Sequence, residues 1–236
     1  MRTHYDLLGM AMNDYYQGNR NAKIKIHSPD FEEDEISVSW YFRPYDLMPV
    51  VEKKALEYCR GKILDIGAGA GSHALYLQRK GMDVTSLDIS GGACEIMRMR
   101  GIKKVIQKDI FHYHEEKYDT LLMVMNGIGV AGTIENLEVL LSTLKGLLNP
   151  GGQVLFDSTD LIYLYSNKHG EARIDLNSEY YGQILFRMEY DDFYTRQFSW
   201  IYMDFDTLAG IAEKKGFKAA KLCEGENHHY LGRLLI

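Results

Sequence analysis

The feature that most constrains the fold is an alternation of short apolar runs with segments of helical periodicity across the middle of the chain. The runs expected to be strands cover residues 62–66, 82–89, 103–110, 118–129 and 153–158. The segments expected to be helices cover residues 71–81, 91–101 and 133–148. Strands that alternate with helices in this way form a parallel sheet with helices on both faces.

The pattern changes on either side of this region. Residues 160–183 are polar, aromatic and irregular, and the alternation in "ILFRMEYDDF" and "RQFSWIYM" then predicts two antiparallel strands. A helix over 206–216 and a terminal strand pair over 217–225 and 228–236 complete the chain. Before residue 62 the pattern predicts helices over 5–18 and 45–61. Between them, the acidic run in 28–44 is expected to be a solvated segment.

The stretch "ILDIGAGAGSHALYL", residues 63–77, joins the first expected strand of the alternating region to its helix. Three glycines at alternate positions strip this turn of side chains, so a ligand can approach the main chain at the positive end of a helix. No phosphate-binding G-x-x-x-x-G-K-[ST] motif is present. The dinucleotide pattern G-x-G-x-x-G/A fits imperfectly, because its third glycine position, counted from Gly67, falls on Ser72.

The ordered set "ILDIGAGAG", "VTSLDIS", "QKDIF", "YDTLLMVMNGIG" and "LKGLLNPGGQVLFD" resembles class I S-adenosylmethionine-dependent methyltransferases. The segment from "FRPYDLMP" to "GSHAL" and the ending "HHYLGRLLI" further resemble a bacterial subgroup of unknown substrate. The resemblance implies a Rossmann-like, doubly wound α/β fold. Its seven-stranded sheet would be mostly parallel with an antiparallel terminal strand, accompanied by an N-terminal helical segment and a β-hairpin insertion. We expect an N-terminal lid or extension at 1–44 and a methyltransferase domain at 45–236, with a substrate-side insertion at 160–205.

The resemblance also assigns residues to the cofactor S-adenosyl-L-methionine and its product S-adenosyl-L-homocysteine. Asp65 would meet the amino group of the methionine part, and Asp88 would accept both ribose hydroxyls, as a carboxylate can. Asn126 would border the methyl group. The full expected cofactor set is Asp65, Gly67, Ala68, Gly69, Gly71, Asp88, Ile89, Asp109, Ile110 and Asn126.

Several of these residues have a purely structural alternative. Asp88 and Asp109 could be helix caps, because an Asp at a strand end often caps the next helix. Asp65 could order the glycine turn through its main chain. Asn126 precedes Gly127, and this Asn-Gly pair could simply form a turn.

The acceptor side is expected to come from the N-terminal segment and the insertion, whose tyrosines would line a lid or be buried aromatics with a wet hydroxyl. Candidate substrate residues are Tyr15, Tyr16, Tyr41, Arg43, Asp157, Asp160 and His229. No residue is assigned as an essential catalytic base. His112 and His114 form an H-x-H pair, but no third and fourth ligand follows at zinc spacing, so no metal is expected.

Charge and cysteine content limit the partners. The net charge of −6 disfavours binding to a phosphate backbone, so a small-molecule acceptor is expected and nucleic acid is not. Three scattered cysteines and the lack of an apolar run of membrane-spanning length favour a cytoplasmic protein without membrane contact, either monomer or homodimer. The alternatives left open are a methyltransferase acting on RNA or protein, a nicotinamide-dependent oxidoreductase, and a non-catalytic cofactor binder.

Overall fold

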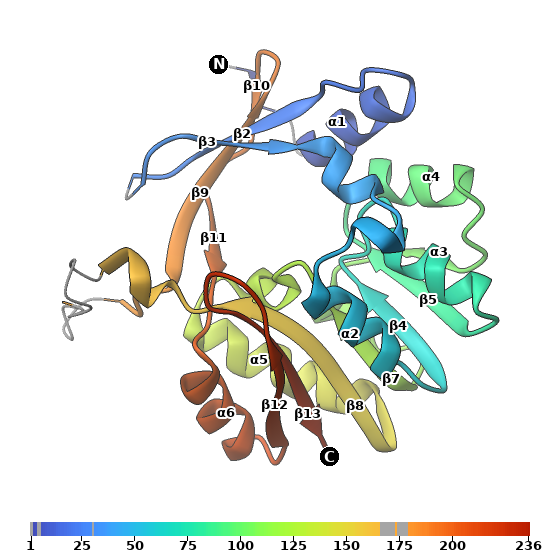
Figure 1. The fold of residues 1–236 in the computed structure, drawn as a ribbon, viewed down its shortest axis with the longest axis vertical. Helices are drawn as coiled ribbons and strands as arrows, with labels where there is room; N and C mark the ends of the chain where they lie inside the picture. The colour runs from blue at the N-terminus through green and yellow to red at the C-terminus, as the bar shows by residue number, and fades with distance from the viewer. Residues whose placement is uncertain (1, 4–5, 30, 166–172, 174–178) are drawn as a thin grey trace. The chain divides into compact units, whose positions relative to one another are not determined.

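A computed structural model describes residues 2–3, 6–29, 31–165, 173 and 179–236 of the 236-residue chain (Figure 1). The chain divides into two compact units. The first comprises Met1–Met48, Arg60–Glu115 and Leu185–Phe198, and the second comprises Pro49–Cys59, Glu116–Ile184 and Ser199–Ile236.

The main sheet has seven strands in the order β12-β13-β8-β7-β4-β5-β6. The strands of the first unit are β4 (Lys62–Ile66), β5 (Asp83–Asp88) and β6 (Val105–Gln107), and they pair in parallel. Those of the second unit are β7 (Tyr118–Met123), β8 (Leu148–Thr159), β12 (Lys218–Glu224) and β13 (His229–Leu235). Strands β7 and β8 are parallel, whereas β13 runs antiparallel to both β8 and β12. The expected fold class is therefore confirmed.

In the first unit, two helices follow strands of this sheet. Helix α3 (Ser72–Arg79) packs on β5, and α4 (Gly91–Met99) packs on β5 and β6. The Ser90 side chain caps α4 by accepting a hydrogen bond from the amide of Ala93 at 2.9 Å. A short 3-10 helix, η3 (Ile110–His112), follows β6.

A second sheet also begins in the N-terminal segment. Its order is β1-β10-β9-β2-β3, and β11 also pairs with β9. The strands are β1 (Arg2–Thr3), β2 (Lys23–His27), β3 (Asp34–Ser37), β9 (Gln183–Tyr190), β10 (Phe193–Tyr194) and β11 (Phe198–Ile201). Helix α1 (Leu7–Tyr16) and the 3-10 helices η1 (Val38–Phe42) and η2 (Tyr45–Leu47) complete this part of the chain.

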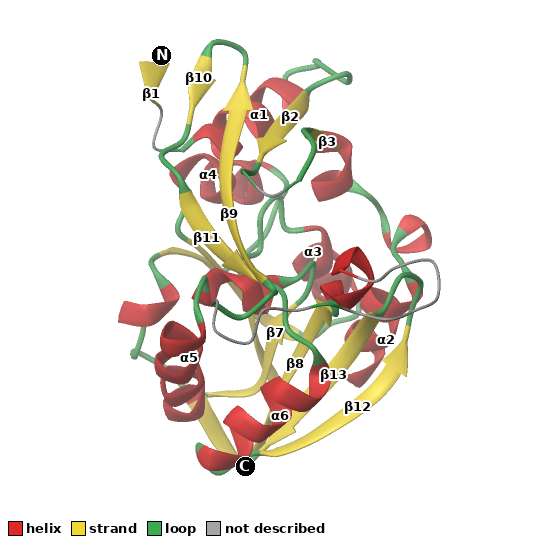
Figure 2. Cartoon of the chain, turned by 90° about the vertical axis from the view of Figure 1, so that its left-hand side faces the viewer, coloured by secondary structure: helices red, strands yellow, loops and turns green. Residues whose placement is uncertain are grey.

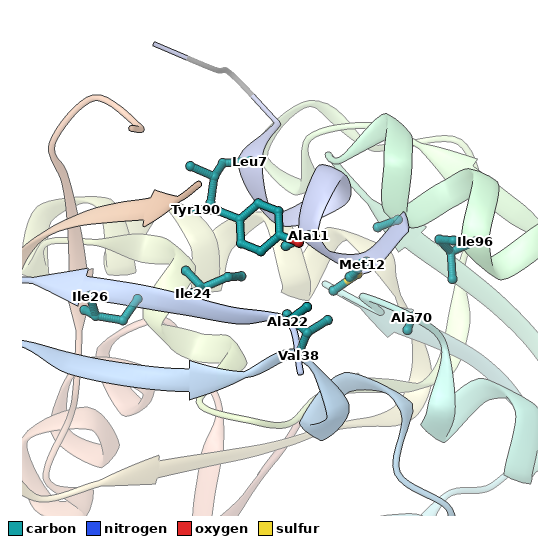
Figure 3. Close-up of a cluster of buried hydrophobic side chains, with 11 residues drawn as sticks. Leu7, Ala11, Met12, Ala22, Ile24, Ile26, Val38, Ala70, Ile96 and Tyr190 are labelled. Carbon is teal, nitrogen blue, oxygen red and sulfur yellow. The ribbon is translucent and has the colours of Figure 1, made fainter. Parts of the chain in front are cut away.

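The core of the first unit joins this N-terminal segment to the glycine turn and α4. Figure 3 shows Leu7 and Met12 of α1 together with Ile24 of β2, Ala70 of the glycine turn and Ile96 of α4. Each of these five side chains is at most 1% exposed. Burial of the four larger side chains, those other than Ala70, contributes roughly 1.5–3 kcal/mol each, so docking of α1 is part of how this unit folds.

The second unit holds the remaining helices. They are α2 (Val50–Tyr58), α5 (Ile134–Leu147), α6 (Phe205–Lys214) and the 3-10 helices η4 (Gly127–Ala131) and η5 (Leu161–Tyr165). Helix α6 runs along β12 and β13 (Figure 2), while α5 buries the row of leucines that predicted it.

Three local predictions differ from the structure. The helix expected over 45–61 begins only at Val50, because a residue before proline is driven to extended backbone, and Met48 has ψ 145° before Pro49. The acidic run at residues 32–35 is exposed, as expected, but the segment 28–44 also holds β3, which pairs with β2, and η1, neither of which was expected. The strand expected over 118–129 ends at Met123, because Met125 and Asn126 adopt φ of 62° and 55°.

Candidate functional site

The glycine turn after β4 consists of three residues with left-handed backbone, because Gly67, Gly69 and Gly71 have φ of 69°, 55° and 77°. Their surroundings differ. A Cβ on Gly67 would meet nothing within 4 Å, whereas one on Gly71 would lie 2.1 Å from Cδ1 of Ile102. The first glycine thus leaves open space beside the main chain, and the last is required by packing.

Asp65 lies next to this turn, in β4, and is only 2% exposed. Burial raises the pKa of its carboxyl to about 6, with the charge of Asp88 adding to the effect and His73 and the Ala74 amide opposing it. Among the residues that the structure describes, its Oδ2 atom has no hydrogen-bond partner. A buried carboxyl oxygen without a partner is costly, so this position suits a cationic or hydrogen-bond-donating ligand.

Asp88 is the last residue of β5, and each oxygen of its carboxylate accepts a hydrogen bond from a backbone amide. Oδ2 accepts a hydrogen bond from the amide of Gly69 at 2.8 Å, and Oδ1 accepts one from the amide of Ser90 at 2.9 Å. Burial nevertheless raises its pKa. Each oxygen keeps a second lone pair, so the carboxylate still has capacity for two further donors. The next residue, Ile89, is 68% exposed.

Asp109 and Ile110 follow β6. The Asp109 side chain accepts a hydrogen bond from the amide of Phe111 at 3.0 Å and so caps η3. This is the helix-cap role that was the structural alternative to cofactor binding. Its other oxygen lies 3.4 Å from Nδ1 of the exposed His112. Ile110 is buried.

The N-terminal segment covers the glycine turn. A Cβ on Gly69 would lie 3.4 Å from Cε of Met12 and 3.5 Å from Cδ1 of Tyr41. The hydroxyl of Ser72 donates to the carbonyl oxygen of Tyr41 at 2.8 Å, which ties η1 to the start of α3. Burial and the nearby charge of Asp88 raise the pKa of Tyr41 to about 12, although Arg43 opposes the shift.

The other N-terminal candidates have different surroundings. Arg43 is buried, donates to the carbonyl oxygen of Trp40 at 3.0 Å and lies over its ring. Tyr15 and Tyr16 stack on Phe42, with ring centroids 4.7 and 6.4 Å apart. The structure therefore brings Tyr41 against the glycine turn, while Tyr15 and Tyr16 pack within the N-terminal segment.

Asn126, Asp157 and His229 lie together in the second unit. The fully buried Asp157 carboxylate accepts hydrogen bonds from the amides of Met125 at 3.0 Å and Asn126 at 2.5 Å, and it lies 3.0 Å from Nε2 of His229. The Asn126 side chain accepts from the hydroxyl of Ser158 at 2.8 Å and donates to the carbonyl oxygen of Ile201 at 3.3 Å.

Asp160 belongs to a tyrosine network in the same unit. It accepts a hydrogen bond from the hydroxyl of Tyr181 at 2.6 Å, and the hydroxyl of Tyr165 donates to the Tyr181 carbonyl oxygen at 3.0 Å. Burial, the bond to Asp160 and neighbouring charges raise the pKa of Tyr181. Part of the expected insertion, residues 166–172 and 174–178, lies outside the described residues.

Two contacts of the first unit were missed from the sequence. Met12 lies on Gly69, and Asp6 both caps α1 and accepts a hydrogen bond from the amide of Gly92 at 2.9 Å. Asp6 carries a recognisable signal, since an Asp before an apolar helix is a typical cap. The contact of Met12 has no local signal, because it depends on how α1 packs.

Comparison with known proteins identifies the family of this chain. The family model described as "Methyltransferase domain" matches residues 39–222. A crystal structure of an S-adenosylmethionine-dependent methyltransferase from Bacteroides fragilis, in complex with S-adenosyl-L-homocysteine, is 40% identical and superposes with a TM-score of 0.91 over 99% of this chain and 96% of that one. The chain belongs to the S-adenosylmethionine-dependent methyltransferases. Its cofactor is S-adenosyl-L-methionine, as expected, and the oxidoreductase alternative is set aside.

More distant members of the methyltransferase family match less of the chain. A ubiquinone biosynthesis O-methyltransferase from Klebsiella pneumoniae is 26% identical over 115 residues, which is 47% of this chain. The match spans 45% of that enzyme's length, so this chain aligns with less than half of it. A methyltransferase from Clostridium acetobutylicum shares the fold, with a TM-score of 0.59 at 14% identity, over 83% of this chain and 92% of that one.

Two features are absent from the described part of this methyltransferase. None of its described helices has the length and apolarity to cross a membrane. Within the same residues, no group of three or more His, Cys, Asp or Glu side chains is arranged to hold a metal ion.

Proposed function

We propose that this methyltransferase acts on a small-molecule acceptor and holds its cofactor with the residues around the glycine turn. S-adenosylmethionine supplies a methyl group on a positively charged sulfur, and the chemistry is that of the cofactor. The protein's part is to hold the donor, align an acceptor with the methyl carbon and exclude water.

The unpartnered oxygen of Asp65 is the observation that supports the cofactor assignment. The amino group of an amino acid is cationic near neutral pH, and it would meet both needs of this carboxylate, charge and hydrogen bonding. Asp88 has the two remaining acceptor positions that a ribose diol needs. Gly67, Ala68, Gly69 and Gly71 would lie along the methionine part.

The remaining assignments concern the adenine, the methyl group and the acceptor. Exposed Ile89 would pack on the adenine, with Asp109 and Ile110 at its polar edge. Because the Asn126 amide is already bonded to Ser158 and Ile201, we propose that Asn126 borders the methyl group through its backbone. We keep Arg43, Asp157, Asp160 and His229 as acceptor-side candidates. Tyr15 and Tyr16 would act only by supporting Phe42.

The cover over the glycine turn supports a small acceptor. Met12 and Tyr41 close in on Gly69 from the N-terminal segment, which fits a lid formed by residues 1–44 over an enclosed site. An enclosed site favours a small molecule over a polymer, and the net charge of −6 is unfavourable for RNA. The Klebsiella relative is named for ubiquinone biosynthesis, which also points to a small acceptor.

A labelling experiment tests this proposal. The chain is incubated with S-adenosylmethionine carrying a tritiated methyl group and, separately, with a panel of phenols, catechols and amines, with total RNA and with a protein extract. We expect label in the small-molecule fraction. Label transferred to RNA or protein instead would favour the alternative acceptors and contradict the proposal.

A further inference from the structure

The buried carboxylate of Asp157 determines where His229 carries its proton. This carboxylate is completely buried and accepts hydrogen bonds from two backbone amides, those of Met125 and Asn126. Two such bonds favour the ionised, acceptor-only form. Nε2 of His229, 3.0 Å from Oδ2, must therefore be the donor, and in the neutral ring the lone pair lies on Nδ1.

The far side of the imidazole is not covered by a side chain at position 225. A Cβ built on Gly225 would come 3.6 Å from Nδ1 and 2.9 Å from Cγ2 of Val51, so glycine leaves room beside the basic nitrogen. The side chain of His229 is 23% exposed, in contrast to the fully buried Asp157. The ring is thus anchored at one nitrogen and partly accessible.

The backbone that holds Asp157 is strained. Met125 and Asn126 are consecutive residues in the left-handed region, with φ of 62° and 55°. Such residues cost on the order of 1 kcal/mol each and tend to occur at functional sites. Here the strain aims both amides at one carboxylate, which fixes the anchor of the histidine.

The cluster lies at the carboxyl ends of strands β7 and β8. Met125 and Asn126 follow the carboxyl end of β7, and His229 pairs with Thr159, the last residue of the parallel strand β8. In open α/β sheets, ligands bind beyond the carboxyl ends of the strands.

We propose that His229 is the general base of this methyltransferase, that Asp157 is its positioning residue, and that the acceptor is a hydroxyl compound. This inference rests on the proposed small-molecule methyl transfer. As the acceptor oxygen bonds to the methyl carbon, the carbon–sulfur bond breaks and its electron pair stays on sulfur. The hydroxyl proton passes to Nδ1 of His229, and the carboxylate of Asp157 balances the imidazolium charge.

The electrostatics of the second unit agree with this role. Burial of the ring lowers the pKa of His229, but the hydrogen bond to Asp157 and the charges of Asp157 in β8 and Glu52 in α2 together raise it. A base with a pKa near the working pH removes protons most effectively.

Histidine NMR on the full chain tests the arrangement without requiring turnover. With ring-¹⁵N histidine and bound S-adenosylhomocysteine, the signal of His229 is identified by its loss in His229→Gln. We expect a neutral ring protonated at Nε2, with a pKa raised above the ordinary histidine value and lowered in Asp157→Asn. A proton on Nδ1, or a pKa insensitive to Asp157→Asn, would overturn the proposal.

Kinetics with catechol as the acceptor tests the role itself. The Gln variant can still donate to Asp157 but has no base, so we expect kcat to fall at least about 100-fold while the Kd for S-adenosylhomocysteine changes less than twofold. The exposed neighbour His228, which stacks on Tyr163, provides the matched control His228→Gln, expected to resemble wild type.

The pH profile gives a further readout. Catechol methylation by wild type should rise through the pKa of His229 and level off, and this step should vanish in His229→Gln. An unchanged rate in the variant would overturn the role of the base. A wild type that binds S-adenosylhomocysteine but labels only amines would overturn the hydroxyl class. A chain that does not bind S-adenosylhomocysteine would instead contradict the proposed function.

Discussion

At the scale of single residues, the buried carboxyl of Asp65 lowers the stability of the free protein at neutral pH and is expected to strengthen binding of a cationic ligand. Burial raises the pKa of this carboxyl from the ordinary value of 3.8 to about 6. Because the folded pKa lies above the unfolded one, the contribution of this group to stability falls as the pH rises from about 4 to above 6. At neutral pH the free protein therefore holds an ionised carboxylate with one unpartnered oxygen, ready for a cation.

The variant Asp65→Asn should separate stability from binding. Near pH 7.5 we expect it to unfold at a higher temperature than wild type when free, because the buried charge is removed, yet to bind S-adenosylhomocysteine at least tenfold more weakly. Wild-type affinity should fall by on the order of tenfold between pH 7.5 and pH 5, as Asp65 becomes protonated, and the variant should lack most of this dependence. Calorimetry and thermal unfolding at both pH values measure these effects. Equal affinity of the two proteins at pH 7.5 would argue against contact with the amino group.

His229 should reveal its ion pair through the pH dependence of stability. Its folded pKa is raised, so the stabilisation is complete below the unfolded value of about 6.5 and is lost as the pH rises through the folded value. We expect His229→Gln to lower the free energy of unfolding more at pH 5.5 than at pH 9, measured by urea denaturation. The exposed-site control His228→Gln should show no such difference. A larger loss at pH 9 would contradict the pairing with Asp157.

At the scale of secondary structure, the crossing of α1 and α4 holds the cover over the glycine turn. One carboxylate, that of Asp6, accepts hydrogen bonds from the amide of Gly9 at 3.0 Å and from that of Gly92 at 2.9 Å. A Cβ on Gly92 would lie 2.7 Å from Cα of Gly9, so the two helix ends meet backbone to backbone. Since α1 carries Met12, this crossing also positions the side chain that lies on Gly69.

Adjacent glycines offer a matched test of this crossing. Gly92→Ala should push α1 away from α4, so we expect a loss of about 1–3 kcal/mol in unfolding free energy and weaker binding of S-adenosylhomocysteine. Gly91→Ala would meet only the flexible end of Gln107, at 3.1 Å, and should stay close to wild type. Urea denaturation and calorimetric titration give both quantities. If the two variants behave alike, the crossing does not control the site.

Sequence patterns predict some of the secondary-structure elements and their pairings but not others. The alternating strands and helices from β4 to β8 were predictable, because each satisfies its own periodicity and ends at a glycine, a cap or a turn. The strand pairing of the second sheet was not predicted from the sequence. Although "KIKIH" in β2 alternates clearly, its partner β9 lies more than 150 residues away, with Lys25 opposite Glu189. No local signal specifies such a pairing, since it depends on the packing of α1 against the sheet.

The candidate site was predictable to the same degree. The positions of Asp65, Asp88 and the glycines follow from strand ends and were found. The contacts of Met12 and Tyr41 with Gly69, and the hydrogen bonds that two strained amides make to Asp157, require a folded chain. Residues that act through long-range contacts of this kind carry no periodic or spacing signal of their own.

At the scale of the whole molecule, ligand binding should stabilise the fold. A ligand that binds only the native state adds roughly 2.7 kcal/mol when present at 100 times its Kd. Because Met12 and Tyr41 of the cover lie against the turn that would hold the cofactor, we expect S-adenosylhomocysteine to raise the unfolding temperature and to slow amide hydrogen exchange in α1. Exchange in α1 that is unaffected by the ligand would contradict a lid formed by the N-terminal segment.

Calorimetric titration of S-adenosylhomocysteine into wild type, Asp88→Ala and Asp83→Ala tests the central claim most directly. Asp83 begins the same strand β5 and is exposed, so it serves as the control. The account predicts tight binding to wild type and to Asp83→Ala. If Asp88 accepts both ribose hydroxyls as proposed, Asp88→Ala loses two charge-assisted hydrogen bonds, and we expect binding on the order of 100-fold weaker or more. Equal affinity of all three proteins would contradict the placement of the cofactor at the end of β5.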